Sequence, residues 1–426
     1  MRHLGTGYQK KKGFEEWVLP REFSVEVAEL TGALRDGLAA VGMKAAMVIA
    51  QQMLQAEVAS LAGEKGKHQR GRQAKRHGQQ GGYVVLGGRK VKILRPRVRT
   101  ADGKEVELRN YRGLQQGEIL DEAAFERMLY GVASRHYGMV DGALPEDLEA
   151  YGTSKSAVSA RFARATGELV QQFLARRIET RMLVVYVDAI FLGSHAVLVV
   201  LGVDSEGRKH VLGMREGSTE NGALTVALLE DLASRGLHAQ KGLLFVVDGS
   251  KAIAAAVQQV FGERALVQRC QVHKRRNVVE HLPKREQGWV SLRLSTAWAQ
   301  SEAGRAKQDL DALAKELDVK YPGAAASLRE GLEQTLTVQK LRLPAQLRRG
   351  LRTTNAIEAL NSQLRSTVRR VSRFTTGDQA LRWATVAALR AEERLYRMAG
   401  YRHLPLLAQA LEVFVSRLDE ATARAS

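Results

Sequence analysis

The sequence is almost without cysteine and does not open on an apolar segment. Its 426 residues include one cysteine, Cys270, so disulfides within the chain are excluded and a reducing, cytoplasmic location is expected. Residues 1–12 are basic and polar, which predicts no secretory signal. Cys270 and His273 form a Cys-x-x-His pair with only His281 close by. These are fewer than the four ligands of a structural zinc site, so no zinc is expected.

Acidic residues are in short supply. Lys and Arg number 65 against 46 Asp and Glu, which gives a formal net charge of +19. Such an imbalance in a long chain favours a polyanionic partner, with nucleic acid first. Binding to a membrane surface is the competing interpretation, but we find no Lys-rich amphipathic helix with aromatic anchors and no lipidation signal. We therefore expect no membrane partner.

A basic, glycine-rich segment occupies residues 64–99. It contains twelve Lys or Arg and one acid, Glu64. Alternating apolar residues in 83–86 and 91–94 predict a hairpin that presents cations to phosphates, although a solvated linker is the plainer alternative. The candidate DNA contacts here are Arg70, Arg72, Lys75, Arg76, Arg95, Arg97 and Arg99.

Helical periodicity covers residues 24–61, with an interruption at Gly42, and residues 121–177. Within the second region, a helix closing at Gly152, a capping hydroxyl at Thr153 and a second helix burying Val158 and Phe162 outline a helix-turn-helix. A plain helical hairpin has the same outline. As a helix-turn-helix, the motif would turn three further residues toward a DNA groove, namely Lys155, Ser156 and Ser159.

Two similar apolar segments each end in an aspartate. Residues 183–188 end in Asp188, and residues 243–248 end in Asp248. The run 183–203 is long enough to suggest a membrane span, but Asp188 near its middle would cost about 3 kcal/mol there, and Gly193 favours a turn. Strands that end side by side would bring both acids to one edge of a sheet. Carboxylates about 4 Å apart repel by a few kcal/mol, which implies a divalent cation or a raised pKa.

The elements around these segments have a recognisable order. Three antiparallel strands, a helix, a strand, a helix and a strand are predicted between residues 183 and 270, which is the order of an RNase H-like core. Asp204 falls in the turn between the second and third strands, so we expect it to be a solvated turn residue rather than a ligand. Residues 275–341 are helical and polar, which indicates an inserted helical subdomain.

A third acid, Glu358, follows the predicted insertion. On a helix, Ile357, Leu360 and Leu364 would form an apolar stripe while Glu358 lies on the polar side. Asn355 three residues earlier forms a capping-box pattern with Glu358, so spacing alone leaves cap and metal ligand equally open. Residues 342–373 hold eight arginines and this single acid, a setting suited to a phosphodiester substrate.

Together these motifs resemble the mutator-type family of bacterial insertion-sequence transposases. The most specific is Gln-x-Cys-x-x-His-x-x-x-Asn, residues 268–277, followed by Thr-Thr-Asn-Ala-Ile-Glu, residues 353–358. The Asp188 strand and the Asp248-Gly249 pair also fit. Departures are small: Ala189 stands where many members carry glycine, and the stretch around 220–221 lacks a tryptophan often seen there.

The resemblance implies a metal-dependent DNA enzyme. It makes Asp188, Asp248 and Glu358 the catalytic DDE triad, with two Mg²⁺ (or Mn²⁺) ions for phosphodiester hydrolysis and strand transfer at terminal inverted repeats and target DNA. A homodimer that pairs two ends in the cytoplasm, at the nucleoid, is expected. Cys270, His273 and Asn277 would belong to a core motif near the active site. Further expected DNA contacts are Lys274, Arg275, Arg276, Arg365, Arg369 and Arg370.

Two other functions fit the same residues. One is a different RNase H-like nuclease, such as a junction resolvase, which needs the acids but no terminal-repeat binding. The other is a non-catalytic DNA-binding regulator in which the acids are caps and turn residues.

The predicted fold class is α/β, an RNase H-like core interrupted by an all-helical insertion and preceded by helical and basic DNA-binding domains with a helix-turn-helix. The expected segments are a helical region 1–62, a basic Gly-rich hairpin 63–115, a helical DNA-binding domain 116–178, a first core part 179–274, the insertion 275–343, a second core part 344–400 carrying Glu358, and a C-terminal helix 401–426.

Overall fold

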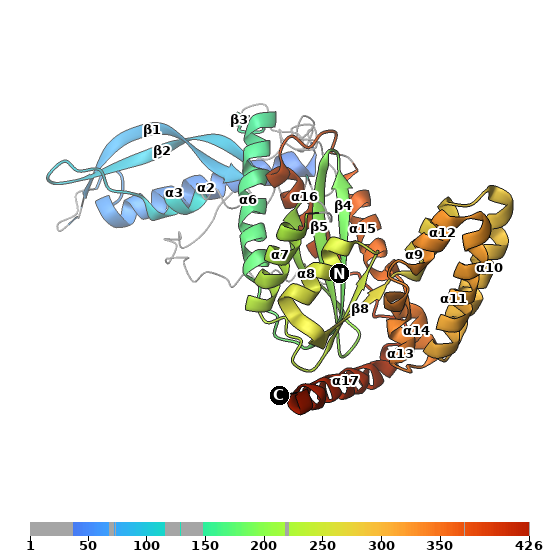
Figure 1. Cartoon of the computed structure of the whole chain (residues 1–426). Helices are drawn as coiled ribbons and strands as arrows, with labels where there is room; N and C mark the ends of the chain where they lie inside the picture. The colour runs from blue at the N-terminus through green and yellow to red at the C-terminus, as the bar shows by residue number, and fades with distance from the viewer. Residues whose placement is uncertain are drawn as a thin grey trace. The chain divides into compact units, whose positions relative to one another are not determined.

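The computed structural model describes residues 37–67, 72, 74–115, 128, 148–217, 221–369 and 371–425. The chain divides into two compact units, Met1–Ala165 and Thr166–Ser426, so the division falls within helix α6 (Lys155–Ala175). Each unit is mixed helix and strand (Figure 1). Across the described residues, no helix combines the length and apolar character that crossing a bilayer requires.

The first unit contains the predicted basic hairpin. Strands β1 (Ala74–Leu86) and β2 (Arg89–Thr100) pair antiparallel around a two-residue turn, Gly87-Gly88, in which both glycines have positive φ. Glycine tolerates this backbone conformation without strain. The hairpin is confirmed, and β1 begins well before the apolar residues that predicted it.

One face of the hairpin packs on helix α2 (Leu38–Ala62). Val84, Val91 and Val98 from the strands meet Leu54 and Val58 from the helix in one buried core. The predicted interruption at Gly42 is wrong, because α2 runs through it without a break. Residues 24–36 of that prediction lie outside the described residues.

A short helix, α3 (Arg109–Leu114), follows the hairpin. Its first N–H groups are those of Arg109 and Asn110, and both donate to the buried carboxylate of Glu57 on α2, at 2.6 and 2.9 Å. These bonds satisfy the donors that a helix start leaves free.

The first helix predicted for the helix-turn-helix is wrong where the structure describes it. Ala150–Tyr151 forms strand β3, which pairs antiparallel with β2. Gly152 follows with φ +85°, and the hydroxyl of Ser154, rather than that of Thr153, accepts the N–H of Ala157 at the start of α6. The second helix is confirmed, since Val158 and Phe162 are buried. Most of residues 121–147 lie outside the described part of the chain.

The second unit is built on a five-stranded sheet in the order β6-β5-β4-β7-β8. Strand β5 runs antiparallel to its neighbours β4 and β6, while β4, β7 and β8 are parallel. The predicted succession of strands and helices over residues 183–270 is confirmed. The bounds are β4 (Met182–Leu192), β5 (His195–Asp204), β6 (Lys209–Glu216), α7 (Gly222–Ser234), β7 (Leu243–Val247), α8 (Lys251–Phe261), η3 (Gly262–Arg264) and β8 (Ala265–Arg269).

Helices cover both faces of this sheet (Figure 1). On one face, Val185 and Phe245 pack against Leu229 of α7 and Val257 of α8. On the other, α15 (Asn355–Val368) packs on β4, and α16 (Gly377–Glu392) packs on β5 and β6. Helix α17 (Leu404–Ala425) follows the short turn η5 (Tyr401–His403) and contacts β4 and η3.

The predicted insertion between β8 and α15 is helical and has its own core. Trp298, Leu310 and Leu328 pack there with Val278, so the insertion already begins within α9. Its elements are α9 (Gln271–Glu280), α10 (Lys284–Ala299), α11 (Ala303–Lys320), α12 (Pro322–Arg329), η4 (Glu333–Leu336) and α13 (Thr337–Lys340), and α14 (Ala345–Leu351) leads back toward α15.

Asp204 is not the solvated turn residue expected from the sequence, because it is buried. Its carboxylate accepts the backbone N–H groups of Glu206 and Arg208, each at 2.9 Å, and contacts Nε2 of His210 at 2.8 Å. Burial raises its pKa, but these hydrogen bonds outweigh it and leave the pKa below its ordinary value. Asp204 therefore holds the β5–β6 turn together.

Candidate active site

Asp188 lies within β4 rather than at its end. The strand continues to Leu192, paired with β5, whereas its pairing with β7 stops at Val187↔Val247. The expected strand end is therefore wrong for β4, but Asp188 still lies where the parallel part of the sheet ends. Its carboxylate accepts the N–H of Ala189 at 2.9 Å.

Asp248 is the first residue after β7. Because Val187 and Val247 are partners in parallel strands, the residues after them, Asp188 and Asp248, stand next to each other at one edge. The Asp248 carboxylate accepts the N–H of Ser250 at 3.0 Å, and Ser250 in turn caps α8. The intervening Gly249 has φ +122°, and a Cβ there would lie 2.4 Å from Nε of Arg269. Only glycine fits this turn.

Glu358 enters on the first turn of α15. The capping-box alternative is wrong, because the helix is capped at Thr354 and Asn355 lies inside it, exposed. Thr354 Oγ1 instead donates to Oε1 of Glu358 at 2.6 Å, so the hydroxyl orients the carboxylate. The Glu358 side chain remains 43% exposed, which leaves it open to a ligand.

Asn361 connects this helix to the sheet. It lies three residues after Glu358, which places both side chains on one side of α15 within about 5 Å along the axis. Nδ2 of Asn361 donates to Oδ2 of Asp188 at 2.8 Å. Asn361 is 1% exposed, and its Oδ1 is buried without a partner among the described residues. The helix that carries the third acid is therefore docked directly on the first.

The three carboxylates act on one another electrostatically. Burial raises the pKa of Asp188 to about 6, with further upward shifts from Asp248 and Glu358, opposed by the Ala189 N–H and by His273. The pKa of His273 is raised by its contact with Cys270 and by Glu358 and Asp248, against the effect of burial. A cluster of acids with these properties favours a cation.

Hard oxygen donors are the ligands that Mg²⁺ and Mn²⁺ accept, and Asp188, Asp248 and Glu358 supply them at one edge of the sheet. The buried, unpartnered Oδ1 of Asn361 is one more oxygen of this type beside Asp188. In the part of the chain that the structure describes, however, no three His, Cys, Asp or Glu side chains are close enough to enclose an ion. The donors fit the metal in kind.

Cys270 and His273 support the site from α9. The hydroxyl of Thr354 is 3.4 Å from Sγ of Cys270, 3.3 Å from Nδ1 of His273 and bonded to Glu358. Cys270 is buried, and His273 Nδ1 is 3.9 Å from Glu358 Oε1. The expectation of a motif near the active site thus has a geometric basis, whereas Asn277 is exposed one turn further along α9.

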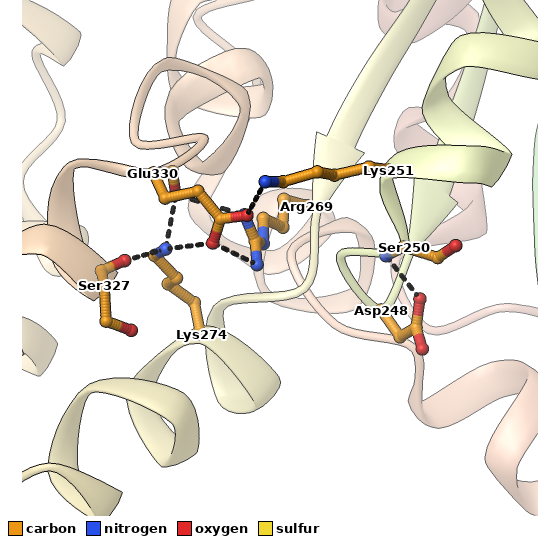
Figure 2. Close-up of polar contacts among 7 residues, drawn as sticks. All are labelled: Asp248, Ser250, Lys251, Arg269, Lys274, Ser327 and Glu330. Atoms are coloured by element: carbon orange, nitrogen blue, oxygen red, sulfur yellow. Dashed lines mark hydrogen bonds and ion pairs between the residues drawn. The ribbon is translucent and has the colours of Figure 1, made fainter. Parts of the chain in front are cut away.

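A cluster around Glu330 ties the insertion to the sheet beside Asp248 (Figure 2). Its carboxylate lies 3.1 Å from Nη2 of Arg269, 3.3 Å from Nζ of Lys251 and 3.5 Å from Nζ of Lys274. Lys274 also donates to the carbonyl groups of Ser327 and Glu330. Burial lowers the pKa of Lys274 to about 8.

Lys274 was expected to contact DNA, and that expectation is wrong. Its side chain is 0% exposed and its ammonium group points into the Glu330 cluster. Arg275 is half-buried with Nη1 3.3 Å from Ser295, while Arg276 is exposed. Consecutive positions on a helix differ by about 100°, which separates these three cations.

Three of the expected DNA contacts in the first unit, Arg76, Arg97 and Arg99, already have protein partners. Arg76 donates to Gln55 and to the carbonyl of Gly63, so it holds β1 to α2. Arg97 makes two bonds to Glu105, at 2.8 and 2.7 Å, and Arg99 shares that carboxylate at 3.3 Å.

The remaining expected contacts are mostly exposed. Arg95 is half-buried and lies over the ring of Tyr111 while donating to Gln80. Those on the surface are Arg72, Lys75, Lys155, Ser156, Ser159, Arg365 and Arg369, and Arg70 and Arg370 lie outside the described residues.

Thr354 and Asn361 were not singled out as site residues from the sequence. The signal available for Asn361 was its spacing from Glu358, since residues three apart share a helix side. For Thr354, the sequence signal was its position directly before the predicted helix. Neither feature distinguishes a site residue from an ordinary cap or a solvated side chain.

Comparison with known proteins assigns this chain to a family. A family model described as Transposase, Mutator family, matches residues 26–396, which include all three acids. The chain belongs to the Mutator family of transposases.

Similar proteins in other bacteria are described as transposases of insertion sequence elements. The transposase for insertion sequence element ISRM5 of Rhizobium meliloti (strain 1021) is 28% identical over 355 residues, covering 81% of this chain and 86% of that protein. The IST2 transposase of Acidithiobacillus ferrooxidans is 34% identical over 169 residues, covering 40% of this chain and 56% of that protein. The ISRM3 transposase of Rhizobium meliloti (strain 1021) is 33% identical over 222 residues, covering 50% and 54%.

Proposed function

We propose that this chain is a DDE transposase that binds the terminal inverted repeats of an insertion sequence and performs Mg²⁺-dependent strand cleavage and strand transfer. The observation that carries the proposal is the docking of α15 on β4 through Asn361 and Asp188. It brings the helix of Glu358 to the edge where Asp188 and Asp248 are neighbours.

The arrangement of the second unit supports an RNase H-like core. Three antiparallel strands are followed by two parallel ones, with one acid on the first strand, one directly after the fourth and one on a later helix. The helical insertion interrupts the chain between the second and third acids. A site at the carboxyl ends of neighbouring strands is also where open α/β sheets bind ligands.

Asp188, Asp248 and Glu358 would hold the metal, which when bound lowers the pKa of a coordinated water or hydroxyl and neutralises charge that develops on the phosphate. The protein groups around them orient these acids. Asn361 fixes one oxygen of Asp188, and Thr354 fixes one oxygen of Glu358. Nδ1 of His273 is 3.9 Å from Oε1 of Glu358, and contact with Cys270, together with Glu358 and Asp248, raises the pKa of His273.

Basic surfaces would hold the DNA. Arg72 is exposed shortly before β1, Lys75 is exposed on β1, Lys155 on α6, and Arg365 and Arg369 at the end of α15. Because such side chains contact backbone phosphates, they give affinity without reading sequence. Transposition requires that two element ends be paired, so we further propose a homodimer that works on double-stranded DNA in the bacterial cytoplasm, at the nucleoid.

The test is cleavage and joining of labelled duplexes that carry the terminal repeats of the element encoding this chain. Wild-type protein should cut and join them only with Mg²⁺ or Mn²⁺. Asp188→Asn, Asp248→Asn and Glu358→Gln should each abolish both steps while binding to the ends persists. Glu420→Gln is the matched control, since Glu420 is exposed on α17.

Two outcomes would favour other functions. Cleavage of random duplexes and junctions with no preference for the ends would indicate a nuclease or resolvase. Specific binding with no metal-dependent chemistry in wild-type protein would indicate a regulator and sink the proposal.

A further inference from the structure

A small cationic cavity reaches Thr353, the residue directly before Thr354, whose hydroxyl bonds to Glu358. It has a volume of about 80 Å³ and lies between α9, α10 and the link that joins α14 to α15. None of the residues that line it is acidic, and two are arginines. The lining residues are Gln271, Val272, Arg275, Ser295, Trp298, Arg352 and Thr353.

Four arginine side chains contribute positive charge at or near this cavity. Arg275 and Arg352 line the cavity, and burial together with the charges of Arg349, Arg348 and Arg275 lowers the pKa of Arg352. In the part of the chain that the structure describes, the side-chain contacts of these arginines are to neutral groups. Arg275 contacts the hydroxyl of Ser295 at 3.3 Å, and Arg348 contacts the carbonyl of Gln300 at 3.0 Å. Among the described residues no acidic side chain pairs with these arginines, so the cluster carries positive charge that this part of the chain leaves uncompensated.

The walls of the cavity are fixed by bonds to the insertion. The side chain of Gln271 donates to the carbonyl of Thr335 at 2.8 Å, and Nε1 of Trp298 donates to the hydroxyl of Thr335 at 3.2 Å. The carbonyl of Arg352 accepts the N–H of Gln271 at 3.0 Å. Because the Gln271 and Trp298 side chains already donate to Thr335, the groups left for a ligand are the guanidiniums and the hydroxyls of Ser295 and Thr353.

The cavity is coupled to the acids through two neighbouring threonines. Thr353 lines the cavity, and Thr354 holds the carboxylate of Glu358. On the other side, α9 carries both Arg275 and His273. A group bound between the arginines would therefore fix the start of α15, which positions Glu358 and Asn361.

We propose that this cavity binds one phosphodiester of the DNA backbone and thereby seats the nucleic acid against the acidic edge. The inference rests on the proposed function. Arginine forks match the oxygens of a phosphate in pairs, and the cavity has room for a phosphate group rather than a base. Inorganic phosphate has the same oxyanion chemistry, and the experiment separates the two sources.

The experiment uses full-length protein, Mg²⁺-free buffer and terminal-repeat duplexes in which single phosphates are replaced by neutral methylphosphonates. At one position, the methylphosphonate should weaken binding of the duplex to wild-type protein. The same replacement should not weaken binding to Arg352→Gln any further. The slope of log affinity against log salt should fall by about one in Arg352→Gln. Arg352→Lys should keep the slope but lose part of the affinity, because it keeps the charge and loses the fork. Arg417→Gln, an exposed arginine on α17, is the matched control and should behave as wild type.

Stability separates this role from a structural one. Removing a charge from an uncompensated cluster should leave the Tm of Arg352→Gln equal to or above that of wild type, whereas a structural arginine would lower it. If no methylphosphonate position depends on Arg352 while the DNA is bound and cut, the cavity inference fails and the proposed function stands. If inorganic phosphate raises the Tm of wild type but not of Arg352→Gln, and DNA binding is unchanged, the cavity takes free phosphate and the inference is overturned. Absence of DNA binding by wild type would overturn both.

Discussion

The side-chain amide of Asn361 on α15 donates to the carboxylate of Asp188 on β4 at 2.8 Å. This bond joins the element that follows the helical insertion to the strand that opens the sheet. Since Asp188 is one of the three acids proposed to hold the metal, the bond should matter for chemistry more than for folding.

Asn361→Ala should slow cleavage of terminal-repeat DNA by roughly 10- to 100-fold, because a hydrogen bond to a charged group contributes about 1.5–3 kcal/mol. The Mg²⁺ concentration that gives half-maximal rate should rise, while affinity for DNA stays unchanged. Asn355→Ala, at an exposed position on the same helix, is the control. A loss of rate with an unchanged Mg²⁺ dependence would contradict the positioning role.

Mg²⁺ should stabilise the protein more near pH 7.5 than near pH 5. Asp188 has a pKa of about 6, so below that pH a proton must leave before the metal binds. In metal-free protein the pH dependence is the opposite. Because the folded protein favours the protonated form of Asp188, this group contributes to the free energy of unfolding at low pH, and the contribution is lost as pH rises through about 6. Thermal unfolding at several pH values, with and without Mg²⁺, measures both effects.

Asp188→Asn provides the control for that experiment. Its Tm should lack the pH-dependent gain from Mg²⁺ and should fall less than wild type between about pH 4 and 6 in the absence of metal. An equal Mg²⁺ effect in the two proteins would place the metal elsewhere.

Glu330→Gln should lower the free energy of unfolding by about 2 kcal/mol. The change leaves Arg269, 5% exposed, and Lys274, 0% exposed, without their carboxylate. Breaking a fully buried ion pair costs about 3–5 kcal/mol, and the 39% exposure of Glu330 reduces that figure. Glu333→Gln is the matched control, since Glu333 pairs with Lys307 and Lys340 while 51% exposed, and it should cost under about 1 kcal/mol. Chemical denaturation of the two variants gives the comparison.

Glu105→Gln should tighten DNA binding. Glu105 neutralises Arg97 and Arg99 on β2, and the Arg97 bond is the main reason that its pKa falls to about 2. Freed of this acid, both guanidiniums become available to phosphates, and the salt slope should steepen by up to about two. Lys75→Ala, by contrast, should make the slope shallower by about one. Unchanged binding in both variants would exclude this face of the hairpin from the DNA contact.

Much of the second unit was predictable because its signals are local. The apolar segments before Asp188 and Asp248 are short, repeated and followed by turn or helix signals, so their strands and their neighbouring positions followed from the sequence. The same holds for the β1–β2 hairpin, whose glycine pair marks the turn. The end of β4 was not predictable, since only its pairing with β5 extends it past Asp188.

The misread residues depend on contacts between distant parts of the chain. Ala150–Tyr151 is a strand because β2 offers it a free edge, which no local pattern reveals. Lys274 shares a basic run with Arg275 and Arg276, yet the insertion core buries it against Glu330. Asn361 looks like any polar residue of an amphipathic helix until its partner on β4 is known.

The position of the insertion also bears on defective gene copies. All five strands precede α9, whereas α15 and α16, which cover one face of the sheet, come after α13. A gene truncated before α15 would therefore encode every strand but leave an apolar layer bare, a product prone to aggregate. The truncated product would carry Asp188 and Asp248 but lack Glu358. Loss of the downstream end of the gene should therefore abolish the activity of the enzyme in a single step.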